Sequence, residues 1–498
     1  MNIGKLPDHL RSHTSTMKLV ALCNAEHFDH HIVYGTIVED LKKLEAGIEI
    51  GGQVIRGTVV HITGDNLGSH GLGGFVENFS SAEYFCRFCE VTRGEFETAG
   101  GETKLYPWRT VESYDNAVRE VRNHGSHRGI KFDSKFNELQ YYHVIPGLPP
   151  CMGHDLFEGF VAFDLKLFID YFVRKKWFTY DQLNKRIKDF PYSAEDKQDR
   201  PCEITGTKNR LTGGACQIWN FVRLFPIFVM DQVQNFEDEV WLCTLLMTEI
   251  VEIVCSPSIH ESHLPYLDDL ICQYLEKRKS LFPSIKLRPK HHYLRHYAAL
   301  IRLFGPLIKV WAMRFESKHR YFKRLVRILL CFKNVIKTAS LKHELYQSYV
   351  RLGADMRLTL DIGKTCKLNS GLYHEDIICA ISSSVPLEDV EECSNLIYKG
   401  VRYNKGDIMA ICQESYQSMI VFGRICLILC SNGSDVYFLF EVIESDFIPF
   451  LRAYEIGNRI AFECHNLKNL SNYKPMRTYA WKNKLLVKPK YGFVTQPT

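Results

Sequence analysis

Two thiols three positions apart could form one half of a metal site. The motif CRFC places Cys86 and Cys89 where both sulfurs could reach one zinc ion, which takes four ligands in a structural site. The stretch KHHYLRHY offers the other half, since His292 and His296 are four residues apart and would project from one face of a helix. His291 is an alternative ligand if the first helical turn is distorted. Free thiols and surface histidines are the simpler interpretation, because spacing alone does not show that two remote pairs meet.

An acidic residue ends the β-branched run QVIRGTVVHITGD. Asp65 would lie at the tip of a predicted strand, which is a rigid place to mount a metal-binding carboxylate. Mg²⁺ takes oxygen ligands and keeps several waters, so two or three carboxylates from separate segments would hold it. The alternative is that Asp65 caps a turn ahead of Gly68, and the local sequence taken alone favours this turn.

A strongly basic helix is predicted over residues 313–330. Glu316 is its single acid, and Arg320, Lys323 and Arg327 follow it along one stripe of the helix. Cations on this stripe would suit a phosphate backbone, with the acid reserved for metal. An exposed helix with internal ion pairs is commoner in general, but one acid cannot pair with so many bases. The predicted DNA-binding side chains are Arg314, Lys318, Arg320, Lys323, Arg324 and Arg327.

The segment PPCMGHDLFEGF carries polar residues at the start of another predicted helix. His154 and Glu158 would share a helical face, and Asp155 could cap the helix start. A structural role is favoured for them, because nothing in the sequence ties this segment to the metal-ligand candidates.

The elements that must position these residues change in character along the chain. Residues 1–104 begin with a predicted strand at 17–24, a helix at 31–47 and a strand at 53–65. A β-α-β unit of this kind is typical of strands that share one sheet, with the helix packed on a face.

The remainder of the chain divides into four predicted segments. Residues 105–290 carry long helical patterns and form a helical insertion, and residues 291–354 supply the closing helices. A polar linker is expected over 355–392. Alternating patterns then predict a small β domain over 393–498, in which Asn-Gly within CSNGSDVYF indicates a hairpin.

The composition limits the class of protein. The chain has 498 residues, of which 46% are hydrophobic and 24% charged, as expected for a folded protein with more than one core. The net charge of +5 names no partner, so any basic surface must be local. Seventeen scattered cysteines and no signal-peptide core predict free thiols in a reducing, intracellular setting. Charged residues interrupt the apolar runs before they could span a bilayer, so no membrane partner is expected.

Taken in order, these motifs resemble the catalytic core of the CACTA (EnSpm) transposases, whose RNase H-like domain is also similar to that of the V(D)J recombinase catalytic subunit. The resemblance covers about residues 17–340. It implies an α+β multidomain fold: a partial RNase H-like α/β core, interrupted by a large all-α insertion and followed by a small C-terminal β-barrel-like domain. The motifs that carry it are GDNLGSHGLGGF, CRFC, LPPCMGHDLFEG, KHHYLRHY and MRFESKHRYFK.

The resemblance assigns a role to each candidate residue. Asp65 matches the second acid of the DDE triad and Glu316 the third, and together they would hold catalytic Mg²⁺. The structural zinc ligands that it implies are Cys86, Cys89, His292 (or His291) and His296.

The first acid of the triad has no counterpart in the sequence. In this fold it lies on a strand ahead of the strand-helix-strand unit. Only about sixteen residues precede position 17, and although they include Asp8 they form no apolar strand. We therefore expect an N-terminally truncated relative in which DNA cleavage and strand transfer by two-metal chemistry are lost or strongly reduced.

Two other functions fit the same residues. A non-catalytic, zinc-stabilised DNA- or chromatin-binding protein would keep the scaffold and the basic helix as binding surfaces. A helical scaffold with incidental motifs would bind no zinc. The resemblance to transposases predicts a nuclear protein that binds DNA. It also allows a homo-oligomer, in which further copies of the chain are partners.

Overall fold

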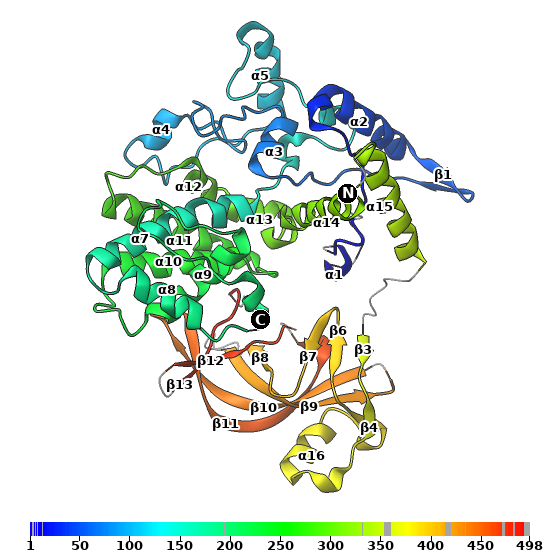
Figure 1. Cartoon of the computed structure of the whole chain (residues 1–498), viewed down its shortest axis with the longest axis vertical. Helices are drawn as coiled ribbons and strands as arrows, with labels where there is room; N and C mark the ends of the chain where they lie inside the picture. Colours follow the sequence, from blue (N-terminus) through cyan, green and yellow to red (C-terminus); the bar gives the residue numbers. More distant parts are fainter. Residues whose placement is uncertain are drawn as a thin grey trace. The chain divides into compact units, whose positions relative to one another are not determined.

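The computed structural model combines helices with antiparallel sheets (Figure 1). Two units can be separated: unit 1 consists of Met1–Lys176, Pro201–Trp219 and Glu237–Asp355, and unit 2 of Trp177–Arg200, Asn220–Phe236 and Met356–Thr498. The structure describes residues 1, 4, 6, 8–11, 13–193, 195–330, 332–352, 360–413, 420–433, 435–470, 474–481 and 484–492.

The first part of unit 1 is organised by one long helix. The predicted helix at 31–47 is confirmed as α2 (His30–Ala46), which begins where the Asp29 side chain accepts a hydrogen bond from the Ile32 N–H. A short antiparallel hairpin follows, formed by β1 (Ile48–Ile50) and β2 (Gln53–Ile55). Val38 of α2 is fully buried in a core that also contains Phe75 and Tyr114.

Of the strands expected on either side of α2, at 17–24 and 53–65, only residues 53–55 form a strand, which is β2. Residues 17–24 and 56–65 have no regular secondary structure, and β1 and β2 are the only strands in the described part of residues 1–104. β-Branched residues favour an extended chain, but a strand also needs a neighbour that pairs with its backbone. Here the Ile62 N–H instead donates to the carbonyl of Gly147, at 3.0 Å. The RNase H-like core therefore stays a prediction.

The helices expected between 105 and 352 are present. The segment that contains His154 and Glu158 forms a π-helix, η3 (Gly153–Val161), which continues directly into α7 (Ala162–Arg174). The helices ahead of η3 are α3 (Asn66–Leu72), α4 (Arg93–Glu97), α5 (Val111–His124) and α6 (Val144–Gly147). Those that follow η3 are α7, α8 (Tyr180–Asp189), α9 (Ala215–Val229), α10 (Glu239–Val254), α11 (Leu264–Leu281), α12 (Pro289–Leu294), α13 (Tyr297–Phe304), α14 (Met313–Leu329) and α15 (Val335–Arg351).

A buried ion network joins α7 to α11 and α12. Asp164 is 1% exposed and accepts hydrogen bonds from Arg278 Nε at 2.9 Å and from the Tyr274 hydroxyl. His291 Nε2 lies 2.8 Å from the same carboxylate and carries the proton, since the Arg288 N–H donates to His291 Nδ1. Burial would raise the pKa of Asp164, but His291, Arg278 and Tyr274 lower it to about 2. The buried charge is tolerated because it is paired and hydrogen-bonded.

Unit 2 is built on an open antiparallel sheet. Its strand order is β12-β13-β11-β10-β9-β5-β4, and β8 also pairs with β9. The described strands close no barrel, in contrast to the expected barrel-like domain. The strands of this sheet are β4 (Thr365–Lys367), β5 (Val390–Cys393), β8 (Ile408–Gln413), β9 (Ile420–Ser431), β10 (Asp435–Ile448), β11 (Ala453–Asn466), β12 (Thr478–Trp481) and β13 (Lys484–Val487). A separate three-stranded sheet contains β3 (Leu360–Ile362), β6 (Leu396–Tyr398) and β7 (Val401–Tyr403).

The predicted hairpin in unit 2 is confirmed. β9 and β10 are antiparallel with Ser431 opposite Asp435. Asn432 and Gly433 between them have φ values of 50° and 67°, the left-handed conformation that tight hairpin turns require and that Asn and Gly tolerate.

The segment expected to be a linker is folded into unit 2. Residues 360–392 contribute β3, β4, most of β5 and α16 (Glu375–Ser382), whose Ile381 is packed in a core with Leu429 and Leu439. Unit 2 also includes α8 and the end of α9, both from the segment predicted as a helical insertion. A buried ion pair joins α9 to the short helix η4 (Asp196–Asp199): Arg223 donates to Asp196 at 2.6 Å, and the Tyr479 hydroxyl of β12 donates to the same carboxylate at 3.1 Å.

Within the described residues, every helix is too short or too polar to cross a lipid bilayer. The cysteines that the structure describes are free thiols.

We expect Asp164→Asn to lower the free energy of unfolding by about 3–5 kcal/mol, because it leaves Arg278 buried without a counter-charge. Denaturant unfolding of the full chain, followed by tryptophan fluorescence, measures this change. Glu276→Gln, at an exposed position of α11, is the control and should shift stability by less than about 0.5 kcal/mol.

The pH dependence gives the prediction a second measurement. The pKa of Asp164 lies below its ordinary value of 3.8, so its stabilisation is present above about pH 4 and is lost as the pH falls through about 2. The wild-type chain should therefore lose about 2 kcal/mol in this interval that Asp164→Asn does not lose. Equal losses in the two proteins would contradict the assignment.

Candidate metal centre

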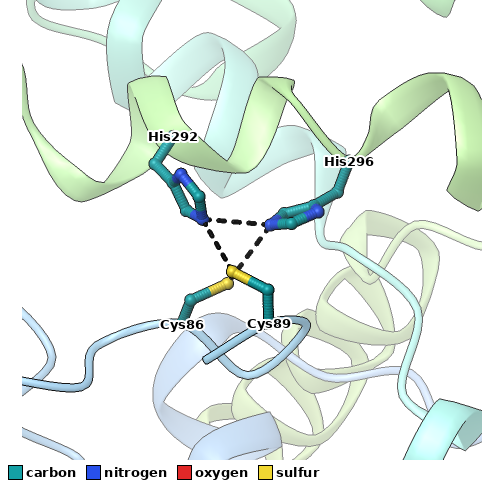
Figure 2. Close-up of side chains that lie close together, drawn as sticks. All are labelled: Cys86, Cys89, His292 and His296. Atoms are coloured by element: carbon teal, nitrogen blue, oxygen red, sulfur yellow. Dashed lines mark hydrogen bonds between the residues drawn. The ribbon is translucent and has the colours of Figure 1, made fainter. Parts of the chain in front are cut away.

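The CRFC loop is fixed by two buried arginines. Arg87, between the two cysteines, is 1% exposed and donates to the Asn66 side chain at 2.8 Å and to the Pro149 carbonyl at 3.2 Å. Arg109 Nε donates to the Cys86 carbonyl at 3.1 Å. The Arg87 side chain and the Cys86 carbonyl of the loop are therefore both anchored, and the two thiols converge below the imidazoles (Figure 2).

The two imidazoles come from a helical stretch that is broken once. His292 lies in α12, whereas His296 immediately precedes α13. Arg295 and His296 keep right-handed helical dihedral angles through the break, so the expected i, i+4 relation survives. Figure 2 shows both rings projecting from this stretch toward the thiols.

The four ligand atoms form one compact group. Cys86 Sγ lies 3.4 Å from His296 Nε2, Cys89 Sγ lies 3.2 Å from His292 Nε2, and the two Nε2 atoms are 3.0 Å apart. A tetrahedral zinc ion with bonds of ~2.3 Å to sulfur and ~2.05 Å to nitrogen needs separations of about 3.5 Å and 3.3 Å. The residues thus fit a closed Cys₂His₂ zinc site, and each is at most 4% exposed.

The electrostatics of this Cys₂His₂ cluster favour ionisation of one of its two thiols. Burial opposes ionisation of Cys86, but Cys89 and His296 hold the pKa of its thiol well below the ordinary value. The Phe88 N–H also donates to Cys86 Sγ, at 3.3 Å. Burial raises the pKa of Cys89 and lowers that of His296, so Cys86 is the thiol that ionises first.

Aromatic rings surround the cluster and exclude water from it. They contact the imidazoles mostly by their edges, which is a favourable geometry for packed rings. The rings beside His292 are Phe85, Phe96 and Tyr106, and those beside His296 are Phe88 and Trp108.

The alternative ligand His291 does not belong to the cluster. Its Nε2 is bound to Asp164 and its Nδ1 accepts from Arg288, so neither ring nitrogen is available for metal. The ligand of the Cys₂His₂ cluster is therefore His292 and not His291.

Asp65 acts as a helix cap. Its Oδ1 accepts a hydrogen bond from the Gly68 N–H at 2.6 Å at the start of α3, as the turn interpretation predicts. The described residues contain two groups of three or more potential metal ligands, and Asp65 is in neither. The geometry therefore gives no support for a Mg²⁺ ion shared by Asp65 and Glu316.

Glu316 belongs to the second of these groups. It lies in the first turn of α14, and its Oε1 is 3.7 Å from His154 Nδ1. Cys151 completes the group. The hydrogen bond with Cys151 raises the pKa of His154 to about 9, opposed by burial and supported by Glu316 and Glu158, so positive charge is favoured here.

The segments that carry Asp65 and Glu316 are neighbours within unit 1. The Thr63 hydroxyl donates to the Val310 carbonyl, three residues before α14, at 3.0 Å. Asn66 donates to the Asp155 carboxylate, and Asp155 directly follows His154. The two acids thus lie on segments that contact each other, although they form no shared cluster.

The basic side chains of α14 divide into two kinds. Lys318 is buried, where its ammonium donates to the Thr14 carbonyl at 2.8 Å, and burial lowers its pKa. Its ammonium is therefore used within the chain, and the structure gives no support for Lys318 as a DNA-binding residue. The remaining five are exposed and have no carboxylate partner among the described residues: Arg314, Arg320, Lys323, Arg324 and Arg327.

Cys151, a member of the second ligand group, is not predicted as a ligand from the sequence. His154 and Glu158 were recognised as sharing a face, but Cys151 was not considered a ligand. The signal was its position three residues before His154, which brings a thiol and an imidazole to the same side of one helical turn.

No protein-family model matches this chain, and a search of curated protein sequences also finds no match.

We expect Cys86→Ser to release one zinc equivalent from the purified full chain and to lower the free energy of unfolding by at least about 3 kcal/mol. The reason is that metal binding supplies folding energy wherever ligands meet only in the folded chain. Metal analysis and denaturant unfolding measure the two effects.

Cys243→Ser is the matched control, because Cys243 is equally buried in α10 but lies outside both ligand groups. Cys243→Ser should retain all the zinc, even if the loss of packing in the core lowers its free energy of unfolding. Equal zinc contents in Cys86→Ser and the wild-type chain would exclude the assigned site.

Proposed function

We propose that this chain derives from a CACTA (EnSpm)-type DDE transposase and now acts as a zinc-stabilised nuclear DNA-binding protein without efficient DNA cleavage. The observation that carries the proposal is the meeting of the CRFC thiols with His292 and His296, which are 203 and 210 positions away in the sequence. The resemblance to transposases implies that these two motifs share one zinc ion, although it rests only on the order of the motifs along the chain. A scaffold with incidental motifs gives no reason for them to converge.

The exposed face of α14 supports DNA as the partner. Five unpaired cations on one helix, Lys318 being excluded, are free to contact phosphates without breaking an ion pair in the described part of the chain. Phosphate contacts of this type bind duplex DNA with little regard to sequence. The proposed binding is therefore electrostatic and strongly dependent on salt.

Two features argue against efficient cleavage. Two-metal chemistry requires carboxylates from separate segments to converge on the ions, whereas the Asp65 carboxylate is used as a helix cap. Glu316 lies beside a thiol and an imidazole, which are ligands suited to zinc and not to Mg²⁺.

Retained cleavage is the second candidate function. The contact between the segments of Asp65 and Glu316, through Asn66 and Asp155, favours it. The Asp65 carboxylate would have to leave the Gly68 N–H before both acids could share an ion.

We expect the triple variant Arg320→Gln, Lys323→Gln, Arg327→Gln to bind duplex DNA at least about tenfold more weakly at 0.1 M salt, because it removes three phosphate contacts. The slope of log affinity against log salt should fall by about 3. Fluorescence anisotropy of a labelled duplex measures both quantities.

A control triple variant, Lys185→Gln, Lys188→Gln, Lys197→Gln, removes the same charge from exposed positions elsewhere. It should leave the affinity within about twofold. If the two triple variants weaken binding equally, α14 is not the DNA-binding element.

We expect the zinc-loaded chain to produce no Mg²⁺-dependent nicking of supercoiled plasmid above the level of Glu316→Gln, because neither ligand group among the described residues contains two carboxylates. Gel separation of nicked and supercoiled forms is the measurement. Nicking by the wild-type chain that both Asp65→Asn and Glu316→Gln abolish would establish the second candidate instead.

A further inference from the structure

The second ligand group combines three different donor atoms. Cys151 Sγ lies 3.0 Å from His154 Nδ1, which lies 3.7 Å from Glu316 Oε1. All three atoms fall within 4.8 Å of one another. Tetrahedral zinc with these ligands needs separations of about 3.4–3.5 Å, so small side-chain adjustments would complete the coordination.

The backbone around this group allows α14 to come close. Gly153 lies between Cys151 and His154, and a Cβ atom there would meet Met313 Sδ at 2.9 Å. Met313 and Glu316 are three residues apart on α14 and therefore share a face. The glycine thus permits the approach that brings the Glu316 carboxylate to the thiol and the imidazole.

Two further observations point to a bound cation. Glu316 Oε1 is buried without a hydrogen-bond partner among the described residues, although it faces the imidazole. The other ring nitrogen of His154, Nε2, lies 3.7 Å from Glu158 Oε2. A histidine that binds metal through one nitrogen usually presents the other to a carboxylate, which fixes the orientation of the ring.

We propose that Cys151, His154 and Glu316 form a second transition-metal site, which takes zinc with three protein ligands and leaves the fourth position open. A thiolate and an imidazole select zinc over Mg²⁺. The side chains of His154 and Glu316 are 23% and 38% exposed, so solvent or a small ligand can reach the ion. This site contrasts with the fully enclosed Cys₂His₂ cluster, and it depends neither on the proposed ancestry nor on DNA binding.

Metal analysis of the full chain provides the first test. The wild-type chain, loaded with zinc and then passed over a desalting column, should carry about two zinc ions, one per ligand group. Glu316→Gln and Cys151→Ser should each carry about one. The Cys₂His₂ ion should remain in both variants.

Matched substitutions control for nonspecific loss. Glu276→Gln and Cys272→Ser change the same residue types on α11, outside both ligand groups, and should keep two ions. If Cys151→Ser does not fold, Glu316→Gln decides alone, because its partly exposed side chain is not needed for packing. One ion in the wild-type chain, or two ions in Glu316→Gln, would overturn the proposal.

Cobalt substitution tests the open position. Azide added to the Co²⁺-loaded wild-type chain should change the visible d–d absorption, because it enters the fourth position of the second site. The Co²⁺-loaded Glu316→Gln chain, which retains the closed site, should not respond. An azide response of equal size in the two proteins, or none in the wild-type chain, would show that no such open site exists.

Discussion

The contact between the CRFC thiols and the imidazoles of His292 and His296 is the constraint on which the architecture of unit 1 depends. Closing a loop of about 200 residues costs conformational entropy, and no backbone ladder joins the two segments to offset it. Coordination of one ion by all four side chains would offset that cost, because the ligands come together only in the folded chain. Burial and a surrounding layer of aromatic rings strengthen the site by excluding water.

The constraint extends beyond the four ligands through a chain of polar contacts. Arg87 lies between the two cysteines and donates to Asn66, which in turn donates to Asp155. Asp155 adjoins His154 in the second ligand group, so the position of that group depends on the placement of the CRFC loop. Both groups use sulfur and imidazole donors. The chemistry that their side chains support is therefore that of zinc, in place of the Mg²⁺ chemistry expected from Asp65 and Glu316.

The sequence predicted the helices well, because their apolar spacing is a local signal. It failed at residues 17–24 and 56–65, where β-branched composition was present but no neighbouring strand completes a sheet. Spacing identified each half of the Cys₂His₂ cluster, yet only the resemblance joined them. The burial of Lys318 was not foreseen, because the number of cations on a helix does not reveal which one is buried. Cys151 was missed because its partner Glu316 is remote in sequence and becomes its neighbour only through the close approach of α14 at Gly153.

Zinc K-edge X-ray absorption of the Glu316→Gln chain tests the central claim most directly, since the second site is then removed and only the Cys₂His₂ ion contributes. The account predicts two sulfur scatterers at about 2.3 Å and two nitrogen scatterers at about 2.0–2.1 Å. A zinc-free protein, or a coordination shell made only of oxygen and nitrogen, would contradict it.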